Sequence, residues 1–396
     1  MFRVLYRDLR HHITTEKPTT IHFNLFGILQ NQNPHLKSIS KIPESTNPPS
    51  FIVDFLVNSC GLSPETALSA AKKTRLCSPE KADSVLSLFE SYGFTKTQIT
   101  KLISHNPKLL SLDPNKNLKP KIEFLNDLGL SGPDLSKFIS SSPAFLSGSL
   151  QNQTIPSFNF LKSYIGSTAN ILILFKRWPS IFDYNLEKVL IPNISILQVH
   201  GVPDSNISKL LTTQPRTLTK NSDRFKEIVE MVNKIGFDPL SPMFAHAVRV
   251  IAGMSKSSWE RKLMVYREFG WSDNDILSAF KKQPYCMLIS EEKLRRRVEF
   301  FLEKVKLKPS EILYHPAILR FSLEKRIVPR CAVLEILYSK GIKRKKLIMS
   351  TVLNMSEEEF LKKFVIQYRE TAPEVMKAYE GGIEFAGFGE VVEVKE

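Results

Sequence analysis

Cysteine is scarce in this sequence, and long apolar runs are missing. The four cysteines, Cys60, Cys77, Cys286 and Cys331, include no C-x-x-C pair, which argues against a disulfide-stapled secreted fold and against a zinc ribbon. The longest apolar candidate, Ile171 to Phe175, stops at Lys176, far short of the roughly 18 residues that a membrane helix needs. We therefore expect a reducing compartment and no membrane-spanning segment.

Motifs for catalysis are also missing. The sequence has no H-E-x-x-H, no P-loop and no G-x-S-x-G, and its eight histidines are dispersed. The glycines of GGIEFAGFGE at 381–390 resemble a phosphate loop only superficially, because neither a preceding strand nor a following helix is indicated. We expect a protein that is not an enzyme and that binds no cofactor and no metal.

The first 50 residues differ from the rest. Arg3, Arg7 and Arg10 share one face of a predicted amphipathic helix, and residues 14–50 are rich in Thr, Asn, Ser and Pro. Six basic and three acidic residues in 1–50 suit a cleavable organellar transit peptide followed by a disordered linker. A plain disordered tail is the alternative.

From about Phe51 the sequence repeats itself with a period near 36 residues. Prolines and glycines mark the repeat independently, and in most units the glycine precedes the proline by fourteen residues. The markers are Gly93, Pro107, Gly129, Pro143, Gly166, Pro179, Gly201, Pro215, Gly236, Gly270, Pro284, Pro316 and Gly341. The unit of Gly236 has Val250 where the proline is expected, and the short unit around Leu307 lacks the glycine.

Physical chemistry gives each marker a role. The glycine follows an apolar helical pattern and suits a left-handed helix C-cap. A second helix then begins with a capping signal, Thr95 with Gln98, Ser131 with Asp134, or Ser272 with Asp275. The proline closes or kinks that helix. About eight such units over 51–382 predict an all-α fold, an α-solenoid superhelix, followed by a disordered acidic tail at 383–396.

The local pattern resembles the mitochondrial transcription termination factor (mTERF) family in its plant form. The resemblance covers about residues 51–382 and is carried by SCGLSPETALSAAKK at 59–73, I-x-x-L-I-x-x-x-P-x-L-L at 99–110, NQTIPSFNFLKS at 152–163, CMLISEEKLRRRVEFF at 286–301, FSLEKRIVPRCAVLEIL at 321–337 and FVIQYRETAPEVMKAYEG at 364–381. It implies repeats of two antiparallel helices and a short 3₁₀ element, with a positive groove for nucleic acid. It also implies action in mitochondria or chloroplasts, in transcription termination, other steps of gene expression or intron splicing.

Positive charge is concentrated toward the C-terminal half. The chain carries 55 Lys and Arg against 40 Asp and Glu, and residues 259–350 carry 21 basic and 11 acidic residues, whereas 351–396 are net acidic. A basic stripe in a stacked array suits a phosphate backbone. The predicted nucleic-acid-binding residues are Lys281, Lys282, Lys293, Arg295, Arg296, Arg326, Arg330, Lys343, Arg344, Lys345 and Lys346.

Other interpretations of these residues stay open. The basic residues also suit solvated helix faces, and Arg297, close to Val298, also suits a position against the core. Aromatic residues among the basic ones could stack on unpaired bases, although aromatics at helical spacing more often belong to the core. They are Phe280, Tyr285, Phe300 and Phe301.

These patterns, with the resemblance, favour a monomeric organellar protein that binds double-stranded DNA and regulates transcription, including termination, in mitochondria. The chloroplast is the alternative location. The alternative functions are an RNA-binding factor for intron splicing or transcript processing, and a protein-interaction scaffold. Transcription or splicing machinery are the expected protein partners.

Overall fold

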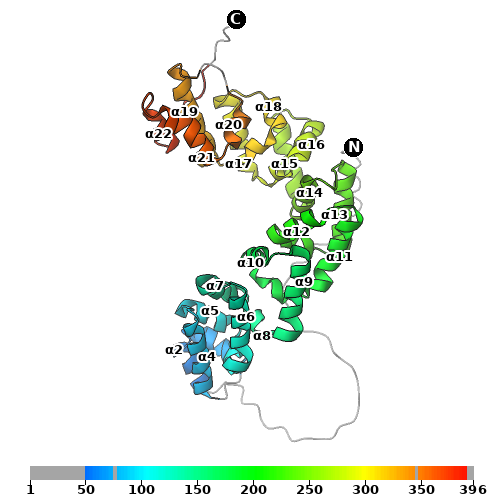
Figure 1. The fold of residues 1–396 in the computed structure, drawn as a ribbon, viewed down its shortest axis with the longest axis vertical. Coiled ribbons are helices and arrows are strands. Elements are labelled where there is room, and N and C mark those ends of the chain that lie inside the picture. Colours follow the sequence, from blue (N-terminus) through cyan, green and yellow to red (C-terminus); the bar gives the residue numbers. More distant parts are fainter. Residues whose placement is uncertain (1–49, 75–77, 344–346, 390–396) are drawn as a thin grey trace. The chain divides into compact units, whose positions relative to one another are not determined.

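All regular elements are helices in the part of the chain that the structure, a computed structural model, describes: residues 50–74, 78–343 and 347–389 (Figure 1). The all-α prediction is confirmed. Within these ranges no helix has both the length and the apolar character needed to cross a membrane. The predicted transit peptide, Cys77, and Arg344 to Lys346 lie outside them.

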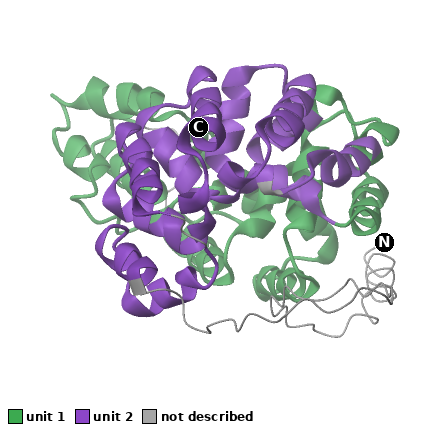
Figure 2. Ribbon diagram, turned by 90° about the horizontal axis from the view of Figure 1, so that it is seen from below, with its two compact units in different colours: residues 1–9, 196–206, 221–396 green, residues 10–195, 207–220 purple. Residues whose placement is uncertain are grey.

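The chain divides into two compact units (Figure 2). The N-terminal unit contains the described residues up to Ser195 together with Ile207–Lys220, and the C-terminal unit contains Ile196–Asn206 and the described residues from Asn221 onward. The division between the units falls within two helices. It separates Ser195 from Ile196 in α11 and Asn206 from Ile207 in α12.

The elements up to residue 219 are α2 (Ser50–Asn58), α3 (Pro64–Ala71), α4 (Pro79–Ser91), α5 (Lys96–His105), η1 (Pro107–Ser111), η2 (Pro114–Leu118), α6 (Lys119–Asp127), α7 (Gly132–Ser141), α8 (Ala144–Ser147), η3 (Leu150–Thr154), α9 (Ile155–Ile165), α10 (Thr168–Arg177), η4 (Pro179–Asp183), α11 (Leu186–Val199), α12 (Asp204–Thr213) and η5 (Pro215–Thr219).

The elements from residue 222 onward are α13 (Ser222–Ile235), α14 (Pro242–Ala252), α15 (Lys256–Glu268), α16 (Asp273–Lys282), η6 (Pro284–Leu288), α17 (Glu291–Glu299), η7 (Phe300–Lys304), α18 (Pro309–Tyr314), η8 (Pro316–Arg320), η9 (Leu323–Ile327), α19 (Val328–Ser339), α20 (Met349–Asn354), α21 (Glu357–Phe360), η10 (Leu361–Val365), η11 (Ile366–Tyr368) and α22 (Glu374–Tyr379).

The glycine markers end the first helix of their repeats in the left-handed region. All seven have positive φ, between 67° and 98°. At Gly236, which follows α13, the next residue Phe237 donates its backbone N–H back to the carbonyl of Val232 and buries its ring. This bond and the apolar contact are those of a Schellman cap, which only glycine adopts at little cost.

The proline markers begin short turns that return the chain to the next repeat. Pro107, Pro179, Pro215, Pro284 and Pro316 are the first residues of five-residue 3₁₀ helices, whereas Pro143 precedes the four-residue helix α8. A proline fits here because the first residues of a helix have no intrahelical partner for a backbone N–H.

A second proline series, which the sequence analysis did not use, lies at the start of first helices. Pro120, Pro156 and Pro329 each follow one turn of π-helix, in η2, η3 and η9. The residue before each proline donates to the carbonyl five positions back, as Lys119 does to Pro114. Because proline has no N–H, the bonding register of the helix shifts by one residue at this point.

Capping predictions hold at two of three places. Thr95 with Gln98 and Ser272 with Asp275 form reciprocal capping boxes. The third prediction is wrong, because Ser131 makes no capping bond with its side chain. Asp134, its expected partner, instead forms an ion pair with Lys176 of the next repeat, with 2.7 Å between Nζ and Oδ2.

The end of the chain differs from the expected disordered tail at 383–396. The side chains of Phe385 and Phe388 are buried, and their rings lie against Phe300 and Tyr338. The backbone N–H of Phe388 donates to the carbonyl of Lys304 at 2.8 Å. The physical reason is the burial of two phenyl rings, which offsets the cost of ordering a short segment. Residues 390–396 lie outside the described part.

Candidate nucleic-acid interface

The two predicted arginines of α17 are neutralised within the protein. The Nε and Nη2 of Arg295 donate to the two carboxylate oxygens of Glu268, both at 2.8 Å, and Arg296 pairs with Glu324 at 2.9 Å. The bidentate bond from Arg295 holds the pKa of Glu268 below its ordinary value. Such exposed pairs stabilise the fold little, but they cancel the local charge that a phosphate would otherwise meet.

The two predicted arginines near the start of α19 point inward. Arg330 is fully buried, and its Nη1 donates to the carbonyls of Val352 and Met355 at 2.7 and 2.9 Å, while Nη2 reaches Glu357 at 2.9 Å. The prediction that Arg330 contacts nucleic acid is therefore corrected, since no donor of a buried guanidinium bound in this way reaches a phosphate.

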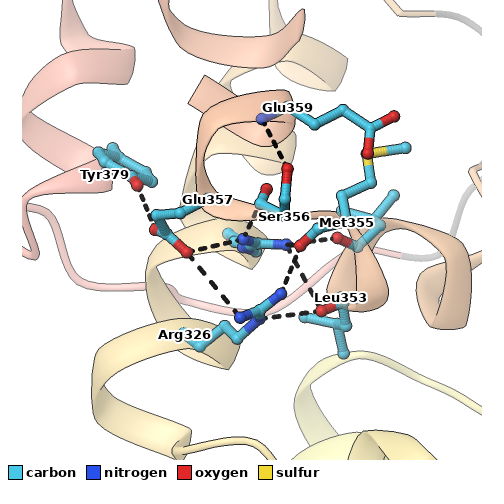
Figure 3. A network of polar contacts seen from close by, with 9 residues as sticks. Arg326, Leu353, Met355, Ser356, Glu357, Glu359 and Tyr379 are labelled. Carbon is cyan, nitrogen blue, oxygen red and sulfur yellow. Dashed lines mark hydrogen bonds and ion pairs between the residues drawn. The ribbon is translucent and has the colours of Figure 1, made fainter. Parts of the chain in front are cut away.

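Arg326 joins the same network (Figure 3). It donates to the carbonyls of Leu353 and Met355, and its side chain is only 25% exposed. These carbonyls lie at the end of α20, where a helix has no partners of its own. Tyr379 completes the network by donating its hydroxyl to Glu357. Arg326 and Arg330 thus hold α19 to α20 and α21, and we remove both from the candidate interface.

Arg330 is one member of a series that recurs along the chain. In five of the repeats a side chain of the first helix donates to a carbonyl of the short turn or helix that ends the repeat, from a buried or half-buried position. The pairs are Lys121 with Leu146, Asn193 with Leu218, Lys262 with Ile289, Arg297 with Leu319, and Arg330 with Val352. Burial lowers the pKa of Lys121 and of Lys262. Part of the basic composition therefore serves the inside of the fold.

Four predicted lysines remain without a carboxylate partner among the described residues. Lys282 is exposed, and its Nζ lies 4.0 Å above the centre of the Tyr314 ring. Lys281 lies beside the Gly236 turn, with its Nζ 3.2 Å from where a Cβ would stand. Lys293 is exposed on α17, and Lys343 lies near the rings of Phe364 and Tyr368. The geometry leaves these charges available to an anion.

Two arginines that the sequence analysis did not select meet at one tyrosine. The guanidinium carbons of Arg249 and Arg320 lie 4.9 and 5.2 Å from the centre of the Tyr285 ring. We call Arg249, Tyr285 and Arg320 the Tyr285 cluster. No periodic sequence signal marks it, because its three residues come from α14, η6 and η8 and meet only in the folded chain.

The predicted aromatic residues are mostly core. Phe280 and Phe301 are buried, and Phe300 packs on Phe385, so the core interpretation applies to these three. Among the described residues, no three or more His, Cys, Asp and Glu side chains gather in a way that could hold a metal ion. The candidate interface therefore consists of cationic side chains, several of them beside aromatic rings.

Helix pairs joined by left-handed glycine turns and separated by proline-led 3₁₀ turns define a helical-repeat protein. The mTERF family model matches residues 86–252 and 242–361. These matches cover more than half of the chain, and the chain belongs to the mTERF family.

One curated relative is transcription termination factor MTERF8, chloroplastic, of Arabidopsis thaliana. It is 26% identical over 162 residues, which make up 41% of this chain and 31% of that protein. The alignment thus spans about a third of the relative's length.

Proposed function

We propose that this protein is an organellar nucleic-acid-binding factor that binds double-stranded DNA and regulates transcription, including its termination. Membership of the mTERF family supports the class of function, and the relative's name contains the words transcription termination factor. The observation that carries the proposal is a set of lysines on the C-terminal unit that have no carboxylate partner in the described part of the chain, namely Lys281, Lys282, Lys293 and Lys343.

Binding through these lysines gives affinity rather than sequence readout. Each lysine that contacts a phosphate releases counterions from the nucleic acid, so the binding constant falls steeply as salt rises. Phosphate contacts fix register and orientation but carry no base information. We expect selection to come from the shape of the duplex, whereas the run Arg344 to Lys346 adds three more cations next to Lys343 and thereby raises affinity.

Two separate features bear on the organelle, and they point to different ones. The amphipathic arginine-bearing start favours mitochondrial import, whereas the relative's name contains the word chloroplastic. We propose the mitochondrion, with the chloroplast as the alternative. Imaging of the full chain fused to a fluorescent protein separates the two.

The test compares two double variants that each remove two positive charges. Lys281→Gln with Lys282→Gln removes unneutralised cations, whereas Arg295→Gln with Arg296→Gln removes cations that are already paired. Fluorescence anisotropy with a DNA duplex and a matching single-stranded RNA, over a series of salt concentrations, gives the slope of log K against log salt. We expect the lysine variant to lower the slope on duplex DNA by about 2 and the arginine variant to change it little.

Three outcomes would change the proposal. Preference for the single-stranded RNA would move the function to transcript processing or splicing. Equal slopes for both variants would show that the ion pairs do not decide which cations bind. Absence of binding to either nucleic acid, with capture of a protein partner after nuclease treatment, would favour the scaffold.

A further inference from the structure

The Tyr285 cluster brings together three successive repeats of the C-terminal unit. Tyr285 is the second residue of η6, Arg249 lies in the last turn of α14, and Arg320 ends η8. Helix α14 packs on η6, and η6 packs on η8. The ring of His246, also on α14, lies 4.8 Å from the ring of Tyr285. Each cation is thus held by a rigid helical element rather than by a loop.

The two guanidinium groups keep their charge. Neither Arg249 nor Arg320 pairs with a carboxylate among the residues that the structure describes. Other arginines of the same unit do, since Arg261 pairs with Glu291 and Arg267 with Asp273. An aromatic ring attracts a cation without neutralising it. The two charges lie no more than about 10 Å apart, because both are close to one ring centre, and an anion between or beside them relieves their repulsion.

Contact with the ring also restricts the directions in which the donors point. A guanidinium held near an aromatic ring keeps its N–H groups in its own plane, where they form a planar fork that matches phosphate oxygens. Less side-chain entropy is then lost when an anion binds. Since two guanidinium groups and His246 already surround the Tyr285 ring, its faces suit the holding of cations better than the stacking of a base.

The cluster exists because one repeat lacks its proline. In six other repeats the residue before the marker proline has left the helix, with φ between −149° and −124°. These residues are Asn106, Ser142, Trp178, Gln214, Gln283 and His315. With Val250 in place of proline, α14 runs on to Ala252 and keeps the equivalent residue, Arg249, helical. The departure from the repeat thus places a cation that the other repeats do not have.

We propose that Arg249 and Arg320, oriented by the ring of Tyr285, bind neighbouring phosphates of a nucleic-acid backbone. This inference rests on the nucleic-acid binding proposed above and assigns some of its phosphate contacts to the Tyr285 cluster. Arg249 and Arg320 are the binding residues, and Tyr285 is a positioning residue that acts through them.

The experiment measures binding of the full chain to a DNA duplex by fluorescence anisotropy over a series of salt concentrations. Arg249→Gln with Arg320→Gln is expected to weaken binding about tenfold or more at low salt and to lower the salt slope by about 2. The matched control is Arg295→Gln with Arg296→Gln, which removes the same charge from paired arginines and is expected to leave the slope unchanged. A second variant, Arg249→Lys with Arg320→Lys, keeps the charge and loses the fork, so we expect the wild-type slope with weaker binding.

Two substitutions test the role of the ring. Tyr285→Phe keeps the ring and is expected to bind like the wild type, whereas Tyr285→Leu removes the ring and is expected to weaken binding several-fold at low salt. A ring with only a structural role would lower the melting temperature of the leucine variant without changing its binding.

The outcomes separate this inference from the proposed function. A wild-type protein that binds no duplex would overturn both. A wild-type protein that binds with a steep salt slope, together with an Arg249→Gln, Arg320→Gln variant of the same slope and affinity, would overturn the phosphate clamp alone. A lysine variant that binds as tightly as the wild type would show that charge alone, and not the oriented fork, makes the contact.

Discussion

Lys306 is under backbone strain, and its replacement by glycine should stabilise the protein. Its φ is 59°, and it is the only non-glycine residue with positive φ in the part of the chain that the structure describes. It follows Gly270 by 36 residues and precedes Gly341 by 35, so it occupies the place of the glycine in the repeat that lacks one. The cap is otherwise intact, because Leu307 donates its N–H to the carbonyl of Phe301 at 2.9 Å.

The expected gain follows from two opposing terms. A left-handed conformation costs a non-glycine residue about 1–2 kcal/mol, and glycine costs about 0.5–1 kcal/mol through the greater freedom of the unfolded chain. At the midpoints of the two ranges, the net stabilisation by Lys306→Gly is about 0.75 kcal/mol. The side chain of Lys306 is exposed, so little packing is lost.

Urea unfolding followed by circular dichroism measures the gain, and hydrogen exchange of residues 300–307 localises it, since repeat proteins can unfold in parts. Lys306→Ala is the matched control, because it removes the same charge but keeps a Cβ, and we expect no comparable gain. In the reverse direction, Gly341→Lys places a side chain in open space at φ 67° and should destabilise. Equal gains for Lys306→Gly and Lys306→Ala would refute the argument and assign the effect to relief of repulsion between Lys306 and its lysine neighbours.

Three further predictions concern buried groups. Arg330→Ala should destabilise the C-terminal unit by about 3–5 kcal/mol, because it leaves buried carbonyls without the donor that the guanidinium supplied. Thermal melting measures this loss of stability, and a loss below about 1 kcal/mol would contradict the prediction. Tyr379 and Arg330 hold the pKa of Glu357 below its ordinary value of 4.5. Its ionised form therefore stabilises the fold above that value, and the stabilisation is lost as the pH falls through the lowered pKa. The melting temperatures of the wild type and of Glu357→Gln should accordingly differ at neutral pH and converge in acid. Burial raises the pKa of Cys60 and Cys286 to about 12 and also raises the pKa of Cys331. Native protein should resist iodoacetamide at all three, as mass spectrometry of native and urea-unfolded samples would show; rapid native labelling would contradict their burial.

The repeat could be predicted from the sequence because its markers act through local sterics. The conformation of a glycine in the left-handed region, or of a proline at the start of a turn, depends on few neighbours. The turns predicted from Gly236 and Pro284 are therefore the turns that the fold contains. Ser131 shows where local rules stop. Its expected partner Asp134 instead forms an ion pair with Lys176 of the next repeat, and no residue spacing within one repeat predicts this pair.

The interface was harder to predict, because a positive charge in the sequence says nothing about its partner. Arg295 and Lys282 look alike as exposed helical cations, yet only Arg295 has a carboxylate from another helix. For Arg330 a signal did exist. Lys121, Lys262 and Arg330 each stand directly before an apolar core residue at a similar phase of the repeat, and a cation that recurs at a core phase indicates an internal donor rather than a surface ligand.

The basic residues of this chain therefore fall into three groups, and only one of them contributes to the nucleic-acid binding that we propose. Internal donors bond to carbonyls at helix and turn ends, as Arg297 does to Leu319 in η8 and Arg330 does to Val352 in α20. Paired arginines such as Arg295 link neighbouring helices. Lys281, Lys282, Lys293, Lys343 and the two arginines of the Tyr285 cluster have no carboxylate partner among the described residues, so their charge is not neutralised. Because only this last group releases counterions on binding, the salt slope should follow the number of unneutralised cations at the interface, well below the formal net charge of +15.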